Sequence, residues 1–141
     1  MITQTLSRSP ALPVVSICLP VYNGESYLKD AIESALGQSF GDFELLIGDD
    51  CSTDRSEEIA QSYAQKDSRI VYWRNATNKG LFGNYNECMN RAVGEFIKPY
   101  AQDDMFEPTM LQEMLAAFKK HPDVTLIACA RRIVDPENNL I

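Results

Sequence analysis

The sequence predicts an α/β fold in which a mainly parallel sheet is covered by helices on both faces. Short apolar, β-branched runs recur along the chain, and segments with helical periodicity lie between them. Polar clusters follow several of these runs directly. Repeated strand–helix units favour a parallel sheet, and such sheets bind ligands beyond the C-terminal ends of their strands.

The first strand is expected at residues 14–19, a mostly apolar run between Pro13 and Pro20. Because this run lacks polar alternation, we expect it to be buried on both faces. The same signal predicts further strands at residues 43–48, 69–74, 95–100 and 124–130.

Four helices are expected between these strands. Two of them show apolar stripes of helical spacing, formed by Tyr27, Leu28, Ala31, Ile32, Ala35 and Leu36 in the first and by Ile59, Ala60 and Tyr63 in the second. A third helix is expected at about residues 82–92, and a fourth from Pro108 through Phe118.

Composition indicates one soluble globular domain. The chain has 141 residues, a formal net charge of −7 and a pI near 4.6, which argue against a surface that binds nucleic acid or anionic lipid. The four cysteines lack the spacing of a zinc site, so we interpret them as reduced packing residues of a cytoplasmic protein.

The two ends of the chain differ from the body. Residues 1–13 contain no apolar run long enough for a signal peptide, and we expect a flexible tail. Residues 126–134 predict a strand, residues 135–139 a turn, and Leu140 the start of a return strand. We interpret this end as a fragment boundary, which would leave a sheet edge able to self-associate.

Three polar clusters follow predicted strands, at residues 20–25, 48–54 and 102–104. In the first, a Pro/Asn/Gly turn into a helix is as good an interpretation as a ligand loop, although Tyr22 offers a flat face for a base. In the second, Thr53 and Asp54 are better explained as helix caps, Asp50 as a hydrogen-bond acceptor for a base, and Asp49 as a residue that orients the loop.

The third cluster contains Asp103 and Asp104. One or two carboxylates, together with phosphate oxygens, are the usual ligands of a hard divalent cation that stabilises a diphosphate leaving group. Helix capping or a plain acidic turn is the alternative interpretation.

The ordered set of motifs resembles family 2 glycosyltransferases, which have the Rossmann-like GT-A fold. The matching segments are residues 15–23, 43–54, 78–80, 94–97 and 102–104, so the resemblance covers nearly all of the chain after Pro13. It implies that residues 14–141 are the nucleotide-sugar-binding portion of a GT-A domain, incomplete before its acceptor half.

The resemblance also implies roles for single residues. Pro20 and Tyr22 would contact the nucleotide base, Asp50 would hydrogen-bond it, Asp103 would lie near the ribose and the metal, and Asp104 would bind Mn²⁺ or Mg²⁺. Glu25 and Lys79 would be further donor contacts, with weaker support. Gln102 departs from the small or acidic residue of many members.

The expected activity is therefore metal-assisted transfer of a sugar from a nucleoside diphosphate-sugar, with UDP as the expected nucleotide, to a hydroxyl group of a carbohydrate or lipid-linked acceptor. The resemblance implies inversion and a catalytic base beyond Ile141. We expect a cytoplasmic protein, with attachment to the inner face of the membrane open for a longer form.

Two alternatives stay open. A non-catalytic nucleotide- or carbohydrate-binding relic of the same fold would carry the same motifs. A receiver-type signalling module would explain the acidic pair at Asp49 and the Lys98-Pro99 pair, although their order and spacing along the chain fit that module poorly.

Overall fold

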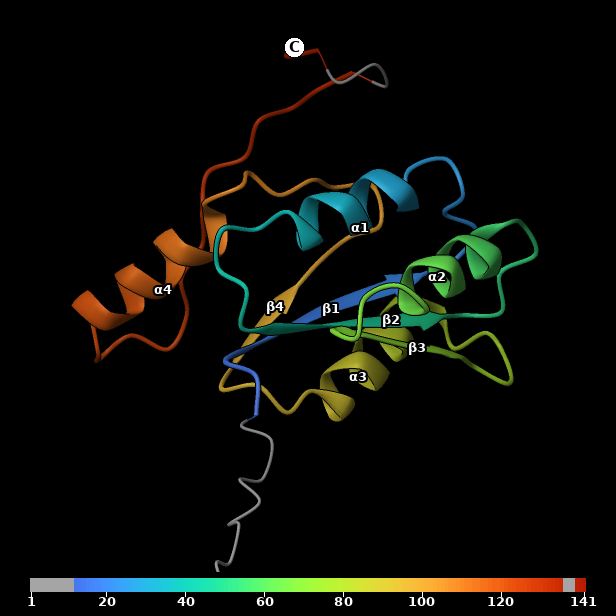
Figure 1. Cartoon of the computed structure of the whole chain (residues 1–141), viewed down its shortest axis with the longest axis horizontal. Coiled ribbons are helices and arrows are strands. Elements are labelled where there is room, and N and C mark those ends of the chain that lie inside the picture. The colour runs from blue at the N-terminus through green and yellow to red at the C-terminus, as the bar shows by residue number, and fades with distance from the viewer. Residues whose placement is uncertain (1–11, 136–138) are drawn as a thin grey trace, which may run out of the picture.

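The computed structural model describes residues 12–135 and 139–141, and contains four strands and four helices in alternation within those ranges. They are β1 (Val15–Val21), α1 (Leu28–Leu36), β2 (Phe43–Asp49), α2 (Ser56–Ala64), β3 (Ile70–Arg74), α3 (Gly80–Arg91), β4 (Phe96–Pro99) and α4 (Met110–Lys120). Figure 1 shows α1 and α2 on one side of the sheet and α3 on the other.

The sheet is parallel throughout, with the strand order β3-β2-β1-β4. In its register Val21 pairs with Asp49 and Asp49 with Arg74, so β1, β2 and β3 end level with one another. The order reverses between β1 and β4, which makes their ends the topological switch point, where ligands of such sheets bind. A receiver-type module has the order 2-1-3-4-5 and is therefore excluded.

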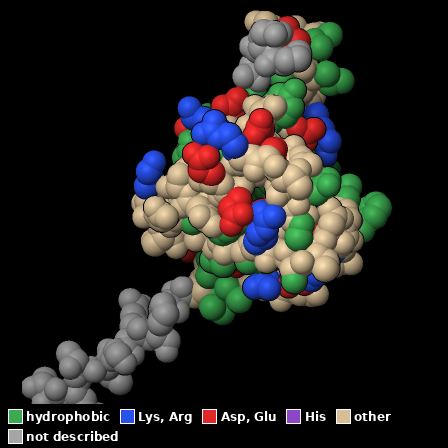
Figure 2. Space-filling model, turned by 90° about the vertical axis from the view of Figure 1, so that its right-hand side faces the viewer, with side chains coloured by type: hydrophobic (Ala, Val, Ile, Leu, Met, Phe, Trp, Pro, Cys, Tyr) green, Lys and Arg blue, Asp and Glu red, His purple; other side chains and the backbone are tan. Residues whose placement is uncertain are grey.

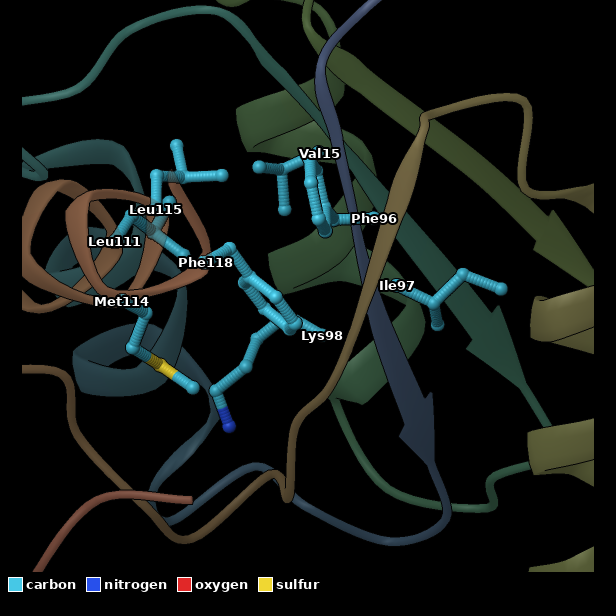
Figure 3. Close-up of a pocket in the computed structure, with 8 residues that line it drawn as sticks. All are labelled: Val15, Phe96, Ile97, Lys98, Leu111, Met114, Leu115 and Phe118. Carbon is cyan, nitrogen blue, oxygen red and sulfur yellow. The ribbon is translucent and has the colours of Figure 1, made fainter. Parts of the chain in front are cut away.

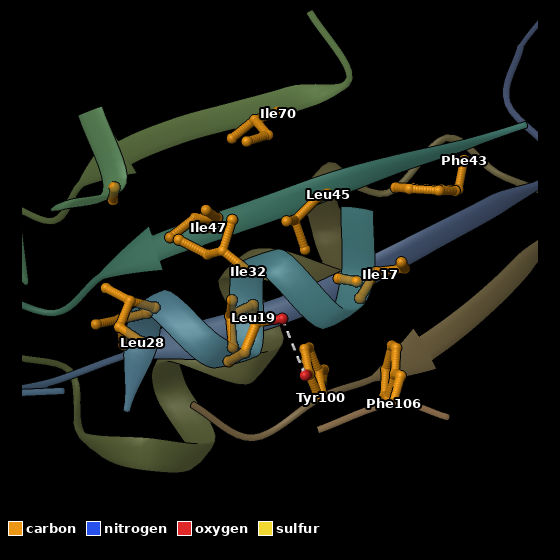
Figure 4. Close-up of a cluster of buried hydrophobic side chains, with 14 of the residues drawn as sticks. Ile17, Leu19, Leu28, Ile32, Phe43, Leu45, Ile47, Ile70, Tyr100 and Phe106 are labelled. Atoms are coloured by element: carbon orange, nitrogen blue, oxygen red, sulfur yellow. Dashed lines mark hydrogen bonds between the residues drawn. The ribbon is translucent and has the colours of Figure 1, made fainter. Parts of the chain in front are cut away.

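The core consists of two apolar layers that share the central strands. All seven residues of β1 are buried, as expected for a strand covered on both faces. Alternate residues from Val15 to Val21 face α1, α2 and the segment after β4, whereas Cys18 packs with Leu46 and Cys88 toward α3. In Figure 4, Tyr100 reaches into the larger layer, and its hydroxyl lies within hydrogen-bond distance of the carbonyl oxygen of Ala31, at 3.1 Å.

The predicted helix stripes are confirmed as core-facing surfaces except at Tyr27, which precedes α1 as its N-cap residue and is exposed. Leu28, Ala31, Ile32 and Ala35 are fully buried in α1, and Ala60 is buried in α2. Helix α4 turns Leu111, Leu115 and Phe118 toward β4, as Figure 3 shows.

The strand predicted at residues 124–130 is wrong. That segment has no regular secondary structure, and all of it except the partly buried Ile127 is exposed. A β-branched run becomes a strand only when another strand satisfies its backbone groups, and no described strand pairs with this run. Accordingly Cys129 is exposed, so its interpretation as a packing residue is also wrong.

The predicted return at the end of the chain is seen only as one antiparallel bridge between Val134 and Leu140. The expected turn lies partly outside the described residues, as does the tail expected at residues 1–13. Within the described ranges, none of the helices has the length and apolar character needed to cross a membrane.

Candidate functional site

The loop after β1 is tied to the loop after β2 by side chains of both. Asn23, at a positive φ of 49°, accepts a hydrogen bond from the backbone N–H of Thr53 at 2.8 Å and donates its own backbone N–H to Ser52 at 3.0 Å. The backbone N–H of Gly24 donates to the Ser56 hydroxyl at 2.8 Å. These bonds hold the loop while leaving the Tyr22 side chain 50% exposed, with a face free to stack.

Asp49 is a structural acid. It is 1% exposed, and it accepts hydrogen bonds from the backbone N–H of Ser52 at 2.8 Å and from the Arg74 guanidinium at 3.0 Å. The Asp49 carboxylate is thus paired with a cation inside the protein, and Arg74 is shared with Glu57 at 2.8 Å. The prediction that Asp49 orients its loop agrees with these contacts.

Asp50 lies on the opposite side of the strand end, in a network of amides. Its Oδ1 accepts from the Asn75 side chain at 2.8 Å and from the backbone N–H of Lys79 at 2.8 Å, and its Oδ2 accepts a longer bond from the same N–H at 3.0 Å. Asn84 supports Asn75 at 3.0 Å and donates to the carbonyl oxygen of Gly48 at 2.7 Å. Asp50 is 2% exposed, and a carboxylate oxygen such as Oδ2 can accept a second hydrogen bond beside the one from Lys79.

The sequence alone did not indicate that Asn75 and Asn84 form the network around Asp50. The signal was the run of asparagines after the third predicted strand, but the residue type alone does not reveal which amide reaches Asp50. The next residue, Cys51, has a positive φ of 64°, a conformation that is costly for a residue with a Cβ. Its thiol donates to the Asn75 carbonyl oxygen at 2.9 Å, which helps to hold the strained turn.

Glu25 and Lys79 have structural contacts. The Glu25 carboxylate accepts the backbone N–H of Arg55 at 2.8 Å, next to the start of α2. Asp54 accepts the backbone N–H of Ser56, the first residue of α2, at 3.0 Å, although Arg55 is the N-cap residue. The Thr53 hydroxyl instead donates to Asn23 at 3.3 Å, so the interpretation of Thr53 as a helix cap is wrong. The ammonium of Lys79 pairs with Glu87 at 2.8 Å, while its backbone N–H binds Asp50. A donor contact of Glu25 or Lys79 stays a prediction.

Asp103 and Asp104 follow β4, across the switch point from Tyr22. Both are exposed, and the backbone carbonyl of Asp104 accepts a bond from the buried Tyr100 hydroxyl at 2.8 Å. Gln102 hydrogen-bonds both backbone groups of Tyr22, at 2.9 Å and 3.1 Å. Burial raises the pKa of Tyr85, and the nearby charges of Asp104 and Asp103 raise it further.

The two carboxylates fit a hard cation that takes most of its ligands from elsewhere. Within the described ranges, no group of three or more His, Cys, Asp or Glu side chains is arranged to hold a metal ion. Mg²⁺ and similar ions are commonly bound through one or two carboxylates plus phosphate oxygens and waters, so two exposed acids are sufficient on the protein side.

The charges on this side of the molecule are mixed. Figure 2 looks onto the side toward which β1 and β2 run, and shows acidic and basic side chains interspersed, with no basic patch that would by itself attract an anion.

Comparison with protein families gives the decisive observation: the family model described as glycosyl transferase family 2 matches residues 16–140. This chain belongs to glycosyl transferase family 2. The described fold is correspondingly the GT-A type.

Named relatives of this family support the assignment. The putative glycosyltransferase EpsE of Bacillus subtilis is 36% identical over 87% of this chain and 45% of its own length. Chondroitin synthase of Escherichia coli is 33% identical over 99% of this chain and 20% of its own length. The chain thus spans less than half the length of the curated relatives it matches.

Two solved structures share the fold of this chain. The S. aureus TarS fragment 1–349 in complex with UDP-GlcNAc has a TM-score of 0.72 and 30% identity, covering 77% of this chain and 32% of that one. The mannosyltransferase PcManGT of Pyrobaculum calidifontis, in complex with GDP-Man and Mn²⁺, has a TM-score of 0.76 and 17% identity, covering 87% and 37%. The second likeness concerns the fold alone.

Proposed function

We propose that this chain binds the donor of a glycosyl transfer reaction, a nucleoside diphosphate-sugar with UDP as its nucleotide. The observation that carries the proposal is the grouping of an exposed aromatic face at Tyr22, an acceptor at Asp50 and two exposed acids at Asp103 and Asp104 around the switch point of a parallel sheet. The TarS structures that match this chain were solved with UDP and UDP-GlcNAc, which supports the choice of uracil.

In this proposal the base stacks on Tyr22, and its imide N–H donates to Oδ2 of Asp50. A contact of the base with Pro20 stays a prediction, because Pro20 is buried within β1. An acceptor held by several donors is preorganised, because Asn75 and the N–H of Lys79 fix the carboxylate before any ligand arrives. Asp103 lies near the ribose.

Asp104, with Asp103 beside it, would hold Mn²⁺ or Mg²⁺ on the diphosphate. The ion would supply Lewis-acid stabilisation of the departing nucleoside diphosphate. This arrangement also explains how a chain with a net charge of −7 accepts a dianionic group without a basic patch.

We extend the proposal to transfer onto a hydroxyl group of a carbohydrate or lipid-linked acceptor, with inversion and a carboxylate base. We assign no residue of the chain as that base. The relation to glycosyltransferases named EpsE and chondroitin synthase supports sugar transfer as the reaction class.

The test is calorimetric titration of the chain with UDP, GDP, ADP and TDP, each with Mn²⁺ and again with EDTA. We expect tightest binding of UDP, dependent on the metal. Equal binding of all four nucleotides would reject the base contact, and binding unaffected by EDTA would reject the metal. No binding of any nucleotide would favour a structural relic or a site that is completed by residues outside this chain.

A further inference from the structure

Gln102 connects two loops that the proposed function places at opposite ends of the ligand. Its amide oxygen accepts the backbone N–H of Tyr22 at 2.9 Å, and its amide nitrogen donates to the Tyr22 carbonyl oxygen at 3.1 Å. The two residues are 80 positions apart in sequence. Directly after Gln102 come the exposed Asp103 and Asp104.

This bridge spans the point where the sheet opens. Pairing of β1 with β4 ends at Cys18 and Pro99, and the N–H of Tyr100 donates to Cys18 at 2.9 Å just beyond. Beyond this bond the segments after β1 and β4 separate. The Gln102 side-chain amide then bonds to the Tyr22 backbone in the way that a backbone peptide group would in a continued strand pair. A side-chain amide suits this position because it both donates and accepts.

Gly24 makes room for the bridge. A Cβ added at Gly24 would lie 2.7 Å from the amide oxygen of Gln102, closer than real contacts allow. The φ angle of Gly24 is not positive, so the main obstacle to a side chain there is Gln102 itself. The sequence thus carries a glycine on one loop and a glutamine on the other that fit together.

We propose that Gln102 is a positioning residue that holds Tyr22 at a fixed distance from Asp103 and Asp104, so that base binding and metal binding are coupled. This inference rests on the proposed function, in which the base lies at Tyr22 and the diphosphate at the acids. A fixed separation lowers the ordering cost of binding a ligand that must touch both ends, and coupling between two sites is reciprocal.

The test combines calorimetry of UDP binding, with Mn²⁺ and with EDTA, for wild type, Gln102→Ala, Gly24→Ala and the double variant. We expect each single variant to bind UDP about three- to tenfold more weakly in Mn²⁺, as loss of one or two exposed hydrogen bonds implies. The ratio of UDP affinity with Mn²⁺ to that with EDTA should fall in both. The double variant should bind within about twofold of Gln102→Ala, because the two changes remove one interaction.

Gln38→Ala is the matched control. Gln38 also bridges two segments, donating to the carbonyl oxygen of Glu107 at 2.8 Å and accepting the N–H of Leu111 at 3.0 Å, but it lies at the end of α1 away from Tyr22. We expect this variant to lose stability and keep the wild-type ratio. A general loss of stability therefore cannot imitate the effect.

A second measurement needs no nucleotide: exchange of the Tyr22 amide proton, followed by NMR, should be faster in Gln102→Ala than in wild type. Wild-type exchange rates in that variant, additive losses in the double variant, or an unchanged ratio would each overturn the coupling while leaving the donor site intact. Failure of the wild-type chain to bind UDP would overturn the proposed function and the coupling with it.

Discussion

At the scale of single residues, the neighbouring acids Asp49 and Asp50 have different surroundings because successive side chains of a strand point to opposite faces. The Asp49 side chain points toward Arg74 and the loop before α2, where it pairs with the Arg74 guanidinium. Asp50 turns toward Asn75 and Asn84, where uncharged amides orient it. Asp49 is therefore paired with a cation, whereas Asp50 is held by uncharged donors alone.

Asp50→Asn tests this assignment by changing the base preference. An asparagine can keep the bonds from Asn75 and Lys79 while offering an N–H₂ group to the base. Uracil presents an N–H at that edge and cytosine an acceptor, so the preference for UDP over CDP should fall by about tenfold or more. The ratio of the two dissociation constants measures it. Asp49→Asn is the control, and an equal change there would contradict the role of Asp50.

Asp104→Asn tests the metal contact. Removing the charge should weaken UDP binding in Mn²⁺ by roughly 10- to 100-fold, a loss that even outer-shell metal partners show on mutation. Binding in EDTA should change little. Asp30→Asn, an exposed acid of α1, should leave both values at wild-type level. Calorimetry with and without Mn²⁺ decides, and retention of the metal effect in Asp104→Asn would refute the assignment.

At the scale of elements, close packing of α3 on the sheet buries two thiols. Cys18 of β1 and Cys88 of α3 are both 0% exposed, and Gly48 permits this approach, because a Cβ there would lie 2.8 Å from Asn84 and 3.1 Å from Cys88. Burial, with a smaller contribution from the charge of Glu44, raises the pKa of Cys18 from 9.0 to about 12. Burial likewise raises the pKa of Cys88 to about 12.

These pKa values predict both reactivity and alkaline stability. The native thiolate fraction of Cys18 and Cys88 should be roughly 1000-fold lower than that of an ordinary thiol, since each pKa unit is a factor of ten. A thiol reagent at pH 8 should therefore modify the exposed Cys129 first and reach Cys18 and Cys88 only on unfolding.

The sign for stability follows from proton binding. The folded state keeps these thiol protons after the unfolded state has lost them, so the contribution to stability is full below pH 9.0 and is lost as pH rises from 9.0 through about 12. Urea unfolding of wild type and Cys88→Ala across that window measures it. The variant should lose less stability with rising pH, and parallel curves would contradict the prediction.

At the scale of the whole molecule, β3 and β4 form the two edges of the sheet. Each edge strand carries an exposed apolar side chain that another chain could contact. Ile97 of β4 is 46% exposed and points away from α4, as Figure 3 shows, and Val71 of β3 is 44% exposed. The segment 124–134 exposes Leu126 and Ile133 at 83% and 72%, and Val124 at its start lines a pocket with Phe96 of β4. The segment that follows α4 therefore adds exposed apolar side chains to the molecule.

We predict concentration-dependent self-association of this chain through the β4 edge. Sedimentation velocity should show a shift to larger species as concentration rises. Ile97→Lys should suppress that shift, since a lysine on an edge strand opposes pairing with another chain. Val71→Lys makes the same change on the opposite edge and should have no such effect. Equal suppression by both variants would exclude β4 as the specific contact.

The alternation of strands and helices, the parallel sheet and its two-sided burial were predictable because each depends on local periodicity. The sequence also placed Asp50, Asp103 and Asp104 after strands of the parallel sheet, where the structure has them, but their grouping into one ligand site stays a prediction. The strand at 124–130 failed because an apolar run contains no information about its pairing partner. The bonds of Gln102 were not predictable for a related reason, because both reach a residue 80 positions earlier in the sequence.

The sequence by itself determined the alternating strands and helices from Val15 to Lys120, their apolar faces, and the family to which the chain belongs, because those properties depend on spacing and residue type along the chain. The tertiary structure alone decided which polar side chain meets which. It placed Arg74 beside Asp49 and Asn75 beside Asp50. It also brought Glu25 to the backbone N–H of Arg55 just before α2, and Gln102 to the backbone of Tyr22. A hydrogen bond forms only when the donor–acceptor distance is right to within a few tenths of an ångström. For atoms far apart in sequence, only the folded chain sets that distance.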